Sequence, residues 1–258
     1  MISDFTQGPR DICDVVSPIE SNRFGMSVSR LNIPFQHSIT DEAIVKICRE
    51  SKSDLLVLRY PSIRIQLSQG LSQIQSKTAF QADTLVYFSK SIDAFVPNFI
   101  DDRGFSIRRA DTTDEQEIRK LSGTIFQGYS NHYQANHFLK ADAIRAGLQE
   151  WAVSSLKIDS GLVLVAEDSS SLLCGFGNFA YEGDNSDFLL SGVDERFRGQ
   201  GIYSEIIGFA SNELSSKGIK RLFISTQIQN QSAIRANLKA GFNFDFSLNT
   251  FHVMPREK

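Results

Sequence analysis

The chain has 258 residues, of which 41% are hydrophobic, and a formal net charge of −3 at pH 7. The hydrophobic fraction is that of a globular protein with a core, and the weakly acidic balance argues against nucleic acid as the main partner, because phosphate binding needs clustered positive charge. No apolar run approaches the roughly 20 residues of a membrane helix, and the polar N-terminus lacks the pattern of a secretory signal. We therefore expect a cytoplasmic protein with no membrane partner.

The three cysteines form no CxxC pair, and the four histidines form no HExxH motif. A sparse, odd set of cysteines is typical of reduced thiols and argues against a disulfide framework or a cysteine-based zinc site. We expect no metal.

The first hundred residues are predicted to form a small α/β domain. Residues 1–30 lack periodicity and are interpreted as an irregular lead-in. Thr40 can cap a helix on which Ile44, Ile47 and Cys48 share one face. The expected elements are a helix over 39–51, a strand over 54–60, a helix over 65–74 and a strand over 83–90.

A domain boundary is predicted at residues 95–104, which carry Pro, two Asp and Gly. The predicted domains are 1–100 and 101–258, without internal repeats. In the second domain, Thr112 and Thr113 can each start a capping box, and residues 127–138 are expected to form an exposed loop. Helices are expected over 112–126, 139–156, 199–218 and 230–241, and strands over 105–110, 161–168, 172–182, 187–194, 221–227, 242–247 and 249–254.

The most informative stretch joins an apolar strand that ends at Val193 to an amphipathic helix through a polar turn with two glycines, Gly199 and Gly201. The first amides of a helix have no internal partners and carry partial positive charge, which suits a phosphate, and Arg198 adds a formal charge. A GxG turn alone is weak evidence for phosphate binding, since such a turn often marks tight packing. The GxGxxG fingerprint and the Walker A lysine are both absent.

The segment Arg198-Gly199-Gln200-Gly201-Ile202-Tyr203 resembles the acyl-CoA motif of the GNAT acyltransferase superfamily, (Gln/Arg)-x-x-Gly-x-(Gly/Ala). The order of elements over 105–254 resembles that family too. The resemblance implies an α/β (α+β) protein: a C-terminal GNAT fold with a mixed, splayed central sheet, plus the smaller N-terminal α/β domain. Tyr203 departs from the pattern, and its side chain must point away from the phosphates or supply a hydroxyl to them.

The resemblance also implies acyl-CoA as cosubstrate. The pantetheine arm would lie between the strands that end at Val193 and Gln227. Asn230 looks like a second contact to CoA, although a helix N-cap explains it equally well. The residues implied in CoA binding are Ser191, Val193, Arg198, Gly199, Gln200, Gly201, Ile202, Tyr203 and Asn230.

Many GNAT enzymes place a tyrosine near the thioester sulfur, and alignment puts Asn237 at that position. An asparagine is no general acid, but its amide can donate a hydrogen bond to sulfur; the alternative is a polar helix residue. The smaller side chain at this position could also leave room near the thioester for an acyl group longer than acetyl, such as 3-hydroxybutyryl. No strong base is evident. His137 leads the candidates, which are Asp187, Glu182, His132 and His137, each also explained as a surface or structural group.

The TQxxN…GF pattern after residue 225 and the final aromatic strand resemble bacterial sugar-nucleotide N-acyltransferases, which act on TDP-linked 3- or 4-amino-dideoxyhexoses for surface polysaccharide and O-antigen synthesis. The DLLVLRYPS segment resembles their N-terminal part. The resemblance implies substrate contacts from Arg59, Tyr60, Gln227 and His252, and a homodimer. A surface pair before a turn is the alternative for Arg59 and Tyr60. A sheet-edge amide is the alternative for Gln227, and a structural histidine is favoured for His252.

Two other functions stay open. The acceptor could be another amine, such as an antibiotic, a polyamine or a protein N-terminus or lysine. Alternatively, the domain could bind acyl-CoA without catalysis and act as a regulator. A protein acceptor predicts an open groove, and a sugar nucleotide predicts a closed cleft with aromatic and cationic groups.

Overall fold

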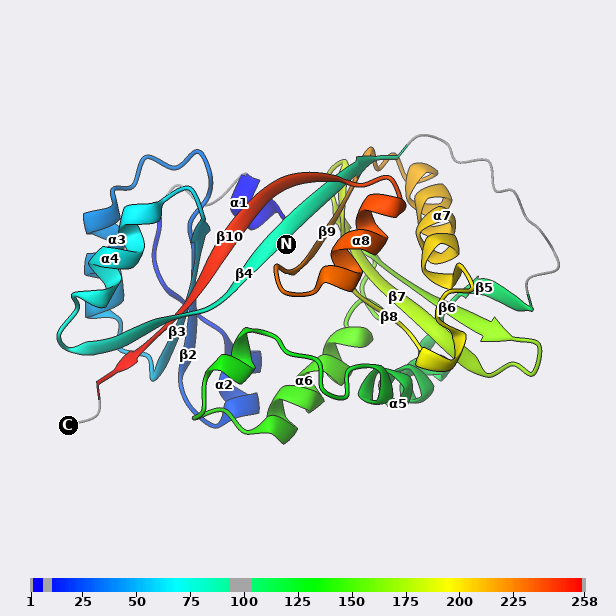
Figure 1. Ribbon diagram of the computed structural model, residues 1–258, viewed down its shortest axis with the longest axis horizontal. Helices are drawn as coiled ribbons and strands as arrows, with labels where there is room; N and C mark the ends of the chain where they lie inside the picture. The colour runs from blue at the N-terminus through cyan, green and yellow to red at the C-terminus, as the bar shows by residue number, and fades with distance from the viewer. Residues whose placement is uncertain (1, 7–10, 93–103, 257–258) are drawn as a thin grey trace.

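The computed structural model describes residues 2–6, 11–92 and 104–256, and one mixed sheet of ten strands runs through it (Figure 1). The strand order is β1-β2-β3-β10-β4-β9-β8-β7-β6-β5. This confirms the predicted α/β fold class with a mixed central sheet. Within the described ranges, no helix has the length and apolar character needed to span a bilayer.

The N-terminal half adds four strands to this sheet. Its elements are α1 (Ser3–Thr6), β1 (Val15–Val16), α2 (Pro18–Phe24), β2 (Val28–Asn32), α3 (Asp41–Glu50), β3 (Leu55–Pro61), α4 (Ile65–Ser72) and β4 (Lys77–Ser91). Helices α3 and α4 pack on one face of β3 and β10, where Leu56, Leu58 and Val253 are buried. Helix α2 lies on the opposite face with α6 and the 3₁₀ turn η2 (Figure 1).

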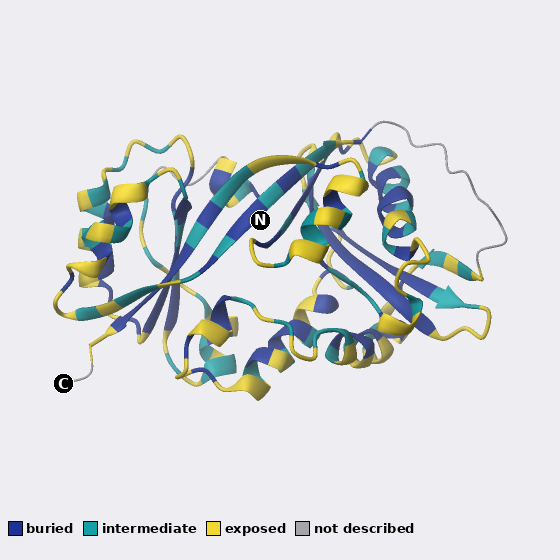
Figure 2. Ribbon diagram, in the orientation of Figure 1, coloured by how far each residue is buried: buried dark blue, intermediate teal, exposed yellow. Residues whose placement is uncertain are grey.

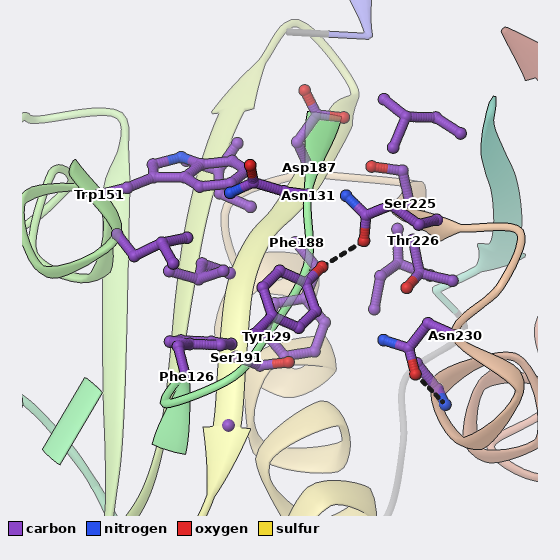
Figure 3. Close-up of a pocket in the computed structure, with 18 of the residues that line it drawn as sticks. Phe126, Tyr129, Asn131, Trp151, Asp187, Phe188, Ser191, Ser225, Thr226 and Asn230 are labelled. Carbon is purple, nitrogen blue, oxygen red and sulfur yellow. Dashed lines mark hydrogen bonds between the residues drawn. The ribbon is translucent and has the colours of Figure 1, made fainter. Parts of the chain in front are cut away.

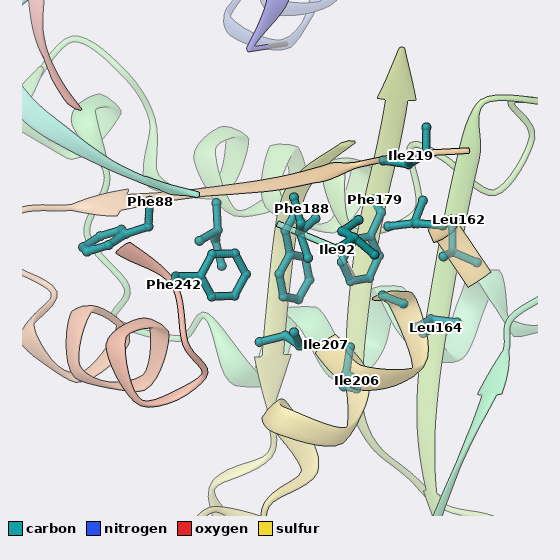
Figure 4. Packing of buried hydrophobic residues seen from close by; sticks show 14 of the residues in the cluster. Phe88, Ile92, Leu162, Leu164, Phe179, Phe188, Ile206, Ile207, Ile219 and Phe242 are labelled. Atoms are coloured by element: carbon teal, nitrogen blue, oxygen red, sulfur yellow. The ribbon is translucent and has the colours of Figure 1, made fainter. Parts of the chain in front are cut away.

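The C-terminal half has the order of elements that the sequence predicts. Its elements are β5 (Phe105–Arg109), η1 (Thr112–Asp114), α5 (Glu115–Ile125), η2 (His132–Ala135), α6 (Ala141–Ala152), β6 (Gly161–Asp168), β7 (Leu173–Glu182), β8 (Asn185–Val193), η3 (Glu195–Phe197), α7 (Ile202–Ser215), β9 (Arg221–Gln227), α8 (Gln231–Lys239) and β10 (Asn243–Pro255). Helix α7 packs on one face of β6–β9, with Ile206 against Phe179 and Phe188 (Figure 4). Helices α5 and α6 cover the other face.

Glycines in β7 let α7 approach the sheet closely. A Cβ added at Gly177 would lie 2.7 Å from Ile206 Cγ2 and 2.9 Å from a ring carbon of Phe188. Real Cβ atoms do not approach this closely, so the contact between helix and sheet requires glycine at this position. In Figure 2, strands β7 and β8 are largely dark blue, which marks them as buried.

The two halves exchange their last strands. Each half contains a β-α-β-α-β unit, formed by β2-α3-β3-α4-β4 in the first half and by β8-α7-β9-α8-β10 in the second. Both units begin with a parallel pair, but β3 pairs with β10 of the other unit and β9 pairs with β4. The long strands β4 and β10 pair with each other between them (Figure 1). The structure therefore contains an internal repeat that the sequence pattern did not reveal.

Several predicted boundaries are wrong. The lead-in over 1–30 contains α2 and most of β2, and the two closing strands are one strand, β10, which accommodates register shifts instead of a turn. Asp111, not a threonine, caps the helix that begins near residue 112: its side chain accepts from the Thr113 N–H, and Asp114 completes the capping box. Most of the predicted domain boundary, over 95–103, lies outside the described residues.

Candidate active site

Strands β8 and β9 separate partway along their length and form a fork. They pair as parallel neighbours only from Asn185 with Arg221 to Phe188 with Ile224. Beyond Phe188, strand β8 continues to Val193 along β7, and β9 continues to Gln227 along β4. A register shift between Asn178 and Phe179 of β7, opposite Leu190 and Phe188, leaves Leu189 outside the register as a bulge. Bulges re-aim a strand, and this one lies where the fork opens.

Helix α7 begins beside the fork without a side-chain cap. Gly201 is its N-cap with φ +91°, and Gly199 has φ +81°, a backbone conformation that glycine adopts without strain. The Arg198 guanidinium donates only a long bond to the Val193 carbonyl, 3.3 Å, and forms no ion pair with a described residue. Uncapped amides, a dipole and a free cation form a site that fits a diphosphate.

A cavity of about 1100 Å³ opens from this turn through the fork into the space between the two halves. In Figure 3, Ser191 and Asn230 lie toward one end, Asp187 lies at the other, and Tyr129 lies between them. The CoA residues predicted from the sequence all line the cavity except Gln200, which is exposed. Asn230 both caps α8, accepting from the Ala233 N–H at 3.2 Å, and faces the cavity.

The centre of the cavity holds a tyrosine–glutamine pair. The Tyr129 hydroxyl donates to Gln227 Oε1 (Figure 3). Burial is the main reason that the pKa of Tyr129 rises to about 12, so this hydroxyl is a donor at neutral pH. Residues 127–138, expected to be an exposed loop, instead bring Tyr129, Asn131 and His132 to the cavity. The expectation is wrong for this part of the segment, because Tyr129, His132 and Tyr133 turn inward, whereas His137 and Phe138 are exposed.

A second pair links helices α7 and α8. The Tyr203 hydroxyl donates to Asn237 Oδ1 at 2.6 Å, and both residues line the cavity. The Tyr203 ring also lies nearly parallel to Phe188, with centroids 6.0 Å apart and an interplanar angle of 14°. The side chain of Tyr203 therefore points away from the turn at Gly199 and Gly201 and toward the fork. This resolves the alternatives left by its departure from the motif.

Asp187 is the titratable group best placed to accept a proton. It is 8% exposed, lines the cavity, and accepts the Ile2 backbone N–H at 2.7 Å through Oδ2. Its other oxygen, Oδ1, has no hydrogen-bond partner among the described residues. Burial raises the pKa of Asp187 to about 6, a value suited to a general base near neutral pH.

Besides Gln200, three predicted catalytic and substrate residues do not line the cavity. His137, the leading base candidate, is exposed and stacks on Phe138, with ring centroids 4.0 Å apart. Tyr60 lies on the other face of the sheet, buried against α3 and α4, because neighbours along a strand face opposite sides. His252 is buried beneath the cavity, and its Nε2 lies 2.9 Å from His132 Nδ1.

Burial and nearby arginines lower the pKa of both buried histidines, that of His252 to about 4. The pair is thus neutral at pH 7. Only His132 of the two lines the cavity. Glu182, the last residue of β7, is exposed.

Arg59 is a cation in the part of the cavity that the N-terminal half of the chain lines. Its Nε donates a long bond to Thr250 Oγ1, 3.4 Å, and it forms no ion pair with a described residue. The neighbouring cation, Arg30, is paired with Glu20 at 2.5 Å, and Tyr133 donates to the same carboxylate. Burial alone would raise the pKa of Glu20, but Arg30 lowers it to about 2. Arg59 therefore forms no ion pair with a described residue and can meet an anion, although the buried carboxylate of Asp83 lies near enough to interact with it electrostatically.

Several cavity residues were not singled out from the sequence. They gather from both halves and from α6, whose Trp151 is 43% exposed and lines the cavity. Asn32 and Tyr87 alternate with apolar neighbours along their strands, whereas Tyr129 and Asn131 have polar or glycine neighbours that give no such signal. These residues are Arg30, Asn32, Tyr87, Tyr129, Asn131 and Trp151. No three His, Cys, Asp or Glu side chains of the described ranges gather in a way that could hold a metal.

Residues 125–242 match the Acetyltransferase (GNAT) family. Among solved structures, a functionally unknown conserved protein from Staphylococcus epidermidis is similar, with a TM-score of 0.62 and 13% identity over 96% of this chain and 92% of that one. A GCN5-related N-acetyltransferase from Kribbella flavida has a TM-score of 0.56 and 10% identity, over 88% and 80% of the two chains.

A tandem GNAT protein from the clavulanic acid biosynthesis pathway has a TM-score of 0.56 and 9% identity, over 90% of this chain and 78% of that one. At these identities the likenesses establish the fold alone. No curated protein matches the sequence. The match over residues 125–242 spans the fork, the glycine turn and both helices that flank the Tyr203–Asn237 pair. Residues 125–242 therefore carry a GNAT acetyltransferase domain, which supports an acyl-CoA-dependent N-acyltransferase.

Proposed function

We propose that this enzyme transfers a short acyl group from acyl-CoA to the amine of a small anionic acceptor, and that the acceptor is a TDP-linked 3- or 4-amino-dideoxyhexose. The observation that carries the proposal is the free cation of Arg59 in the same cavity as the fork. A cavity of about 1100 Å³ is large enough for both a pantetheine arm and a small acceptor.

The spacing of the sheet supports an elongated acceptor. The row Gln227, Leu85, Leu248 and Pro61 crosses four neighbouring strands, β9, β4, β10 and β3. Three strand spacings separate β9 from β3, roughly 14 Å. Arg59 lies on β3 and lines the cavity. An acceptor whose anion binds Arg59 and whose amine lies near β9 must therefore carry the two groups well apart. A diphosphate attached to an amino sugar has this layout, and Tyr87 and Trp151 supply aromatic surfaces for a base.

The chemistry requires a neutral amine and a place for its proton. Asp187 faces the acceptor end of the cavity and takes the proton as the amine nitrogen bonds to the thioester carbon. The carbon–sulfur bond then breaks, and its electron pair goes to sulfur. The Tyr129–Gln227 pair lies between Asp187 and the turn that fits the diphosphate, where it aligns the reactants.

The acyl group we propose is acetyl. Asn237 is smaller than a tyrosine, but the Tyr203 ring fills the space beside it and stacks on Phe188. This leaves little room for a chain such as 3-hydroxybutyryl.

A thiol-release assay with acetyl-CoA tests the proposal. The acceptors to compare are both TDP-amino-dideoxyhexoses, an aminoglycoside, spermidine and a peptide with a free N-terminus. We expect release with a TDP-amino sugar, and Arg59→Gln should raise the KM for that sugar without changing the KM for acetyl-CoA. Release confined to spermidine or the peptide overturns the acceptor class. CoA binding without turnover on any amine favours a regulatory protein.

A further inference from the structure

A backbone amide fixes the proton positions on the two buried histidines, His252 and His132. Asn136 Oδ1 accepts the Phe138 N–H at 3.1 Å, and a backbone N–H can only donate. The Asn136 Nδ2 group therefore lies at the other side of the amide, 3.2 Å from His252 Nδ1 and 3.2 Å from Met254 Sδ. Because an amide nitrogen can only donate, His252 Nδ1 must be an unprotonated acceptor.

The same requirement determines the proton on the second ring. A neutral histidine with a bare Nδ1 carries its proton on Nε2, so His252 Nε2 donates to His132 Nδ1 across 2.9 Å. His132 must then carry its own proton on Nε2. A proton on His132 Nδ1 would force one onto His252 Nδ1 as well, against the donors of Asn136. Burial and the charge of Arg59 also disfavour a cation on either ring and lower the pKa of both.

The His132 Nε2–H group opens to the cavity. Nε2 makes no hydrogen bond with a described residue, and it is not among the unpaired polar atoms of the described ranges that are shielded from solvent. His132 lines the cavity and is 4% exposed, whereas His252 lies behind it at 0%. A neutral ring whose only accessible nitrogen carries a proton can donate a hydrogen bond but cannot accept a proton. The geometry therefore excludes the role of general base that the sequence left open for His132.

The charged groups around this nitrogen favour an anion. Arg59 and Arg30 both lie near enough to His132 to disfavour a positive charge on it, and the charge of Arg30 is offset by its ion pair with Glu20. Arg59 has no ion pair with a described residue and lines the same cavity. The Asp83 carboxylate interacts with Arg59, but both of its oxygens are shielded from solvent. Arg59 and His132 thus offer a cation and a neutral donor to one oxyanion.

We propose that His132 Nε2–H donates a hydrogen bond to the anionic group of the acceptor beside Arg59. His252 and Asn136 are positioning residues that keep the proton on this nitrogen. The inference deepens the proposed function and rests on it, because it assigns a second donor to the diphosphate of the acceptor. An ionised diphosphate only accepts hydrogen bonds and matches this donor, whereas an ammonium group only donates and is rejected.

NMR of the full chain reads the proton positions without any ligand. In ¹⁵N-labelled protein at pH 7, correlations from the ring C–H protons to the ring nitrogens distinguish a nitrogen that carries a proton from a bare one. The chain has only four histidines, so single-histidine variants assign the signals. We expect a protonated Nε2 and a bare Nδ1 on both His132 and His252. A bare Nε2 on His132, or protons on both of its nitrogens, overturns the proposal.

Asn136→Ala tests what fixes the protons. Without the Nδ2 donor, both directions of the hydrogen bond between the rings are allowed, so the His132 nitrogen signals should move toward values averaged over the two tautomers. His137→Ala is the control, because His137 is the next residue along the chain and is exposed. It should leave the signals of His132 and His252 unchanged. Unchanged signals in Asn136→Ala would contradict the positioning role.

Calorimetric titration of TDP tests the contact with the anion. His132→Ala should weaken TDP binding roughly 10- to 100-fold, the effect of losing a hydrogen bond to a charged group. His132→Gln keeps an N–H donor, and its loss of affinity should be no more than about threefold. With a TDP-amino sugar as acceptor, His132→Ala should raise KM and leave kcat unchanged. His137→Ala should match the wild type in both measurements.

The outcomes separate failure of this inference from failure of the proposed function. If the wild type and His132→Ala bind TDP equally, only the inference about His132 fails. If kcat falls in both His132→Ala and His132→Gln, the residue transfers a proton and the donor role is wrong. If the wild type binds no TDP but acylates an amine without a phosphate, the proposed acceptor class fails together with the inference.

Discussion

Burial raises the pKa of Asp187 to about 6, so the carboxylate is ionised at pH 7 yet basic enough to take a proton from an ammonium group. For Asp187→Asn we expect kcat/KM for the acceptor to fall about 100-fold or more. In the wild type, kcat/KM should rise with pH through an inflection near 6, where Asp187 ionises, and level only above the pKa of the acceptor amine, roughly 8 for a group of the α-amino type. Asp159→Asn, at an exposed site, is the control and should keep the wild-type profile. A wild-type profile without an inflection near pH 6 contradicts the role.

The same residue makes a prediction for stability, with a sign that follows from the raised pKa. A carboxyl whose pKa is about 6 when folded and 3.8 when unfolded leaves the free energy of unfolding unchanged well below pH 3.8, because it is protonated in both states. Between pH 4 and 6 it increasingly lowers the free energy of unfolding, and above pH 6 this destabilisation is constant. Asp187→Asn should therefore gain stability over the wild type across this interval, by roughly 3 kcal/mol at most. Urea unfolding at pH 4 and pH 7 measures the difference, and a variant less stable at pH 7 contradicts it.

At the scale of single elements, the first turn of α7 is the part on which CoA affinity depends. Gly201 has φ +91° at its N-cap, and Gly218, beyond its far end, has φ +82° with nothing within 4 Å of an added Cβ. Alanine at either position should cost roughly 1–2 kcal/mol of folding stability, since both require the left-handed region. Only Gly201→Ala should also weaken CoA binding, by about tenfold or more, because it distorts the amides beside the diphosphate. Thermal unfolding and calorimetric titration measure the two effects, and equal losses of affinity in both variants would refute this assignment.

At the scale of the whole molecule, the repeat predicts one CoA per chain. The parallel pair of the first unit, β2 and β3, stays joined along all of β2, and the Ile33 N–H continues it to the Arg59 carbonyl. Helix α3, the counterpart of α7, is capped by Thr40 and begins with Asp41 and Glu42, which repel phosphate. Calorimetric titration should give a stoichiometry of one, and a value of two would mean that the first unit also opens.

The sequence predicted those features that depend on neighbouring residues. The glycine turn, the helix that follows it and the order of elements over 105–254 could be identified because capping, periodicity and turn chemistry are local. The cavity could not be, because its walls meet through pairings such as β3 with β10 and β4 with β9. The bond from the Ile2 N–H to Asp187 joins residues 185 positions apart. Strand β2 was missed because its two apolar residues, Val28 and Leu31, are three apart and break the alternation of a strand. The repeat was missed because its two units share topology but not motifs.

We propose that acyl-CoA lies in the fork of β8 and β9 with its diphosphate on the first turn of α7. A crystal structure of the full chain with CoA is the decisive experiment. We expect diphosphate oxygens on the amides of residues 199–204, close to Arg198, and a pantetheine arm between residues 189–193 and 225–227, ending near Asn237. Density for CoA at any other place on the chain would show that this binding mode is wrong.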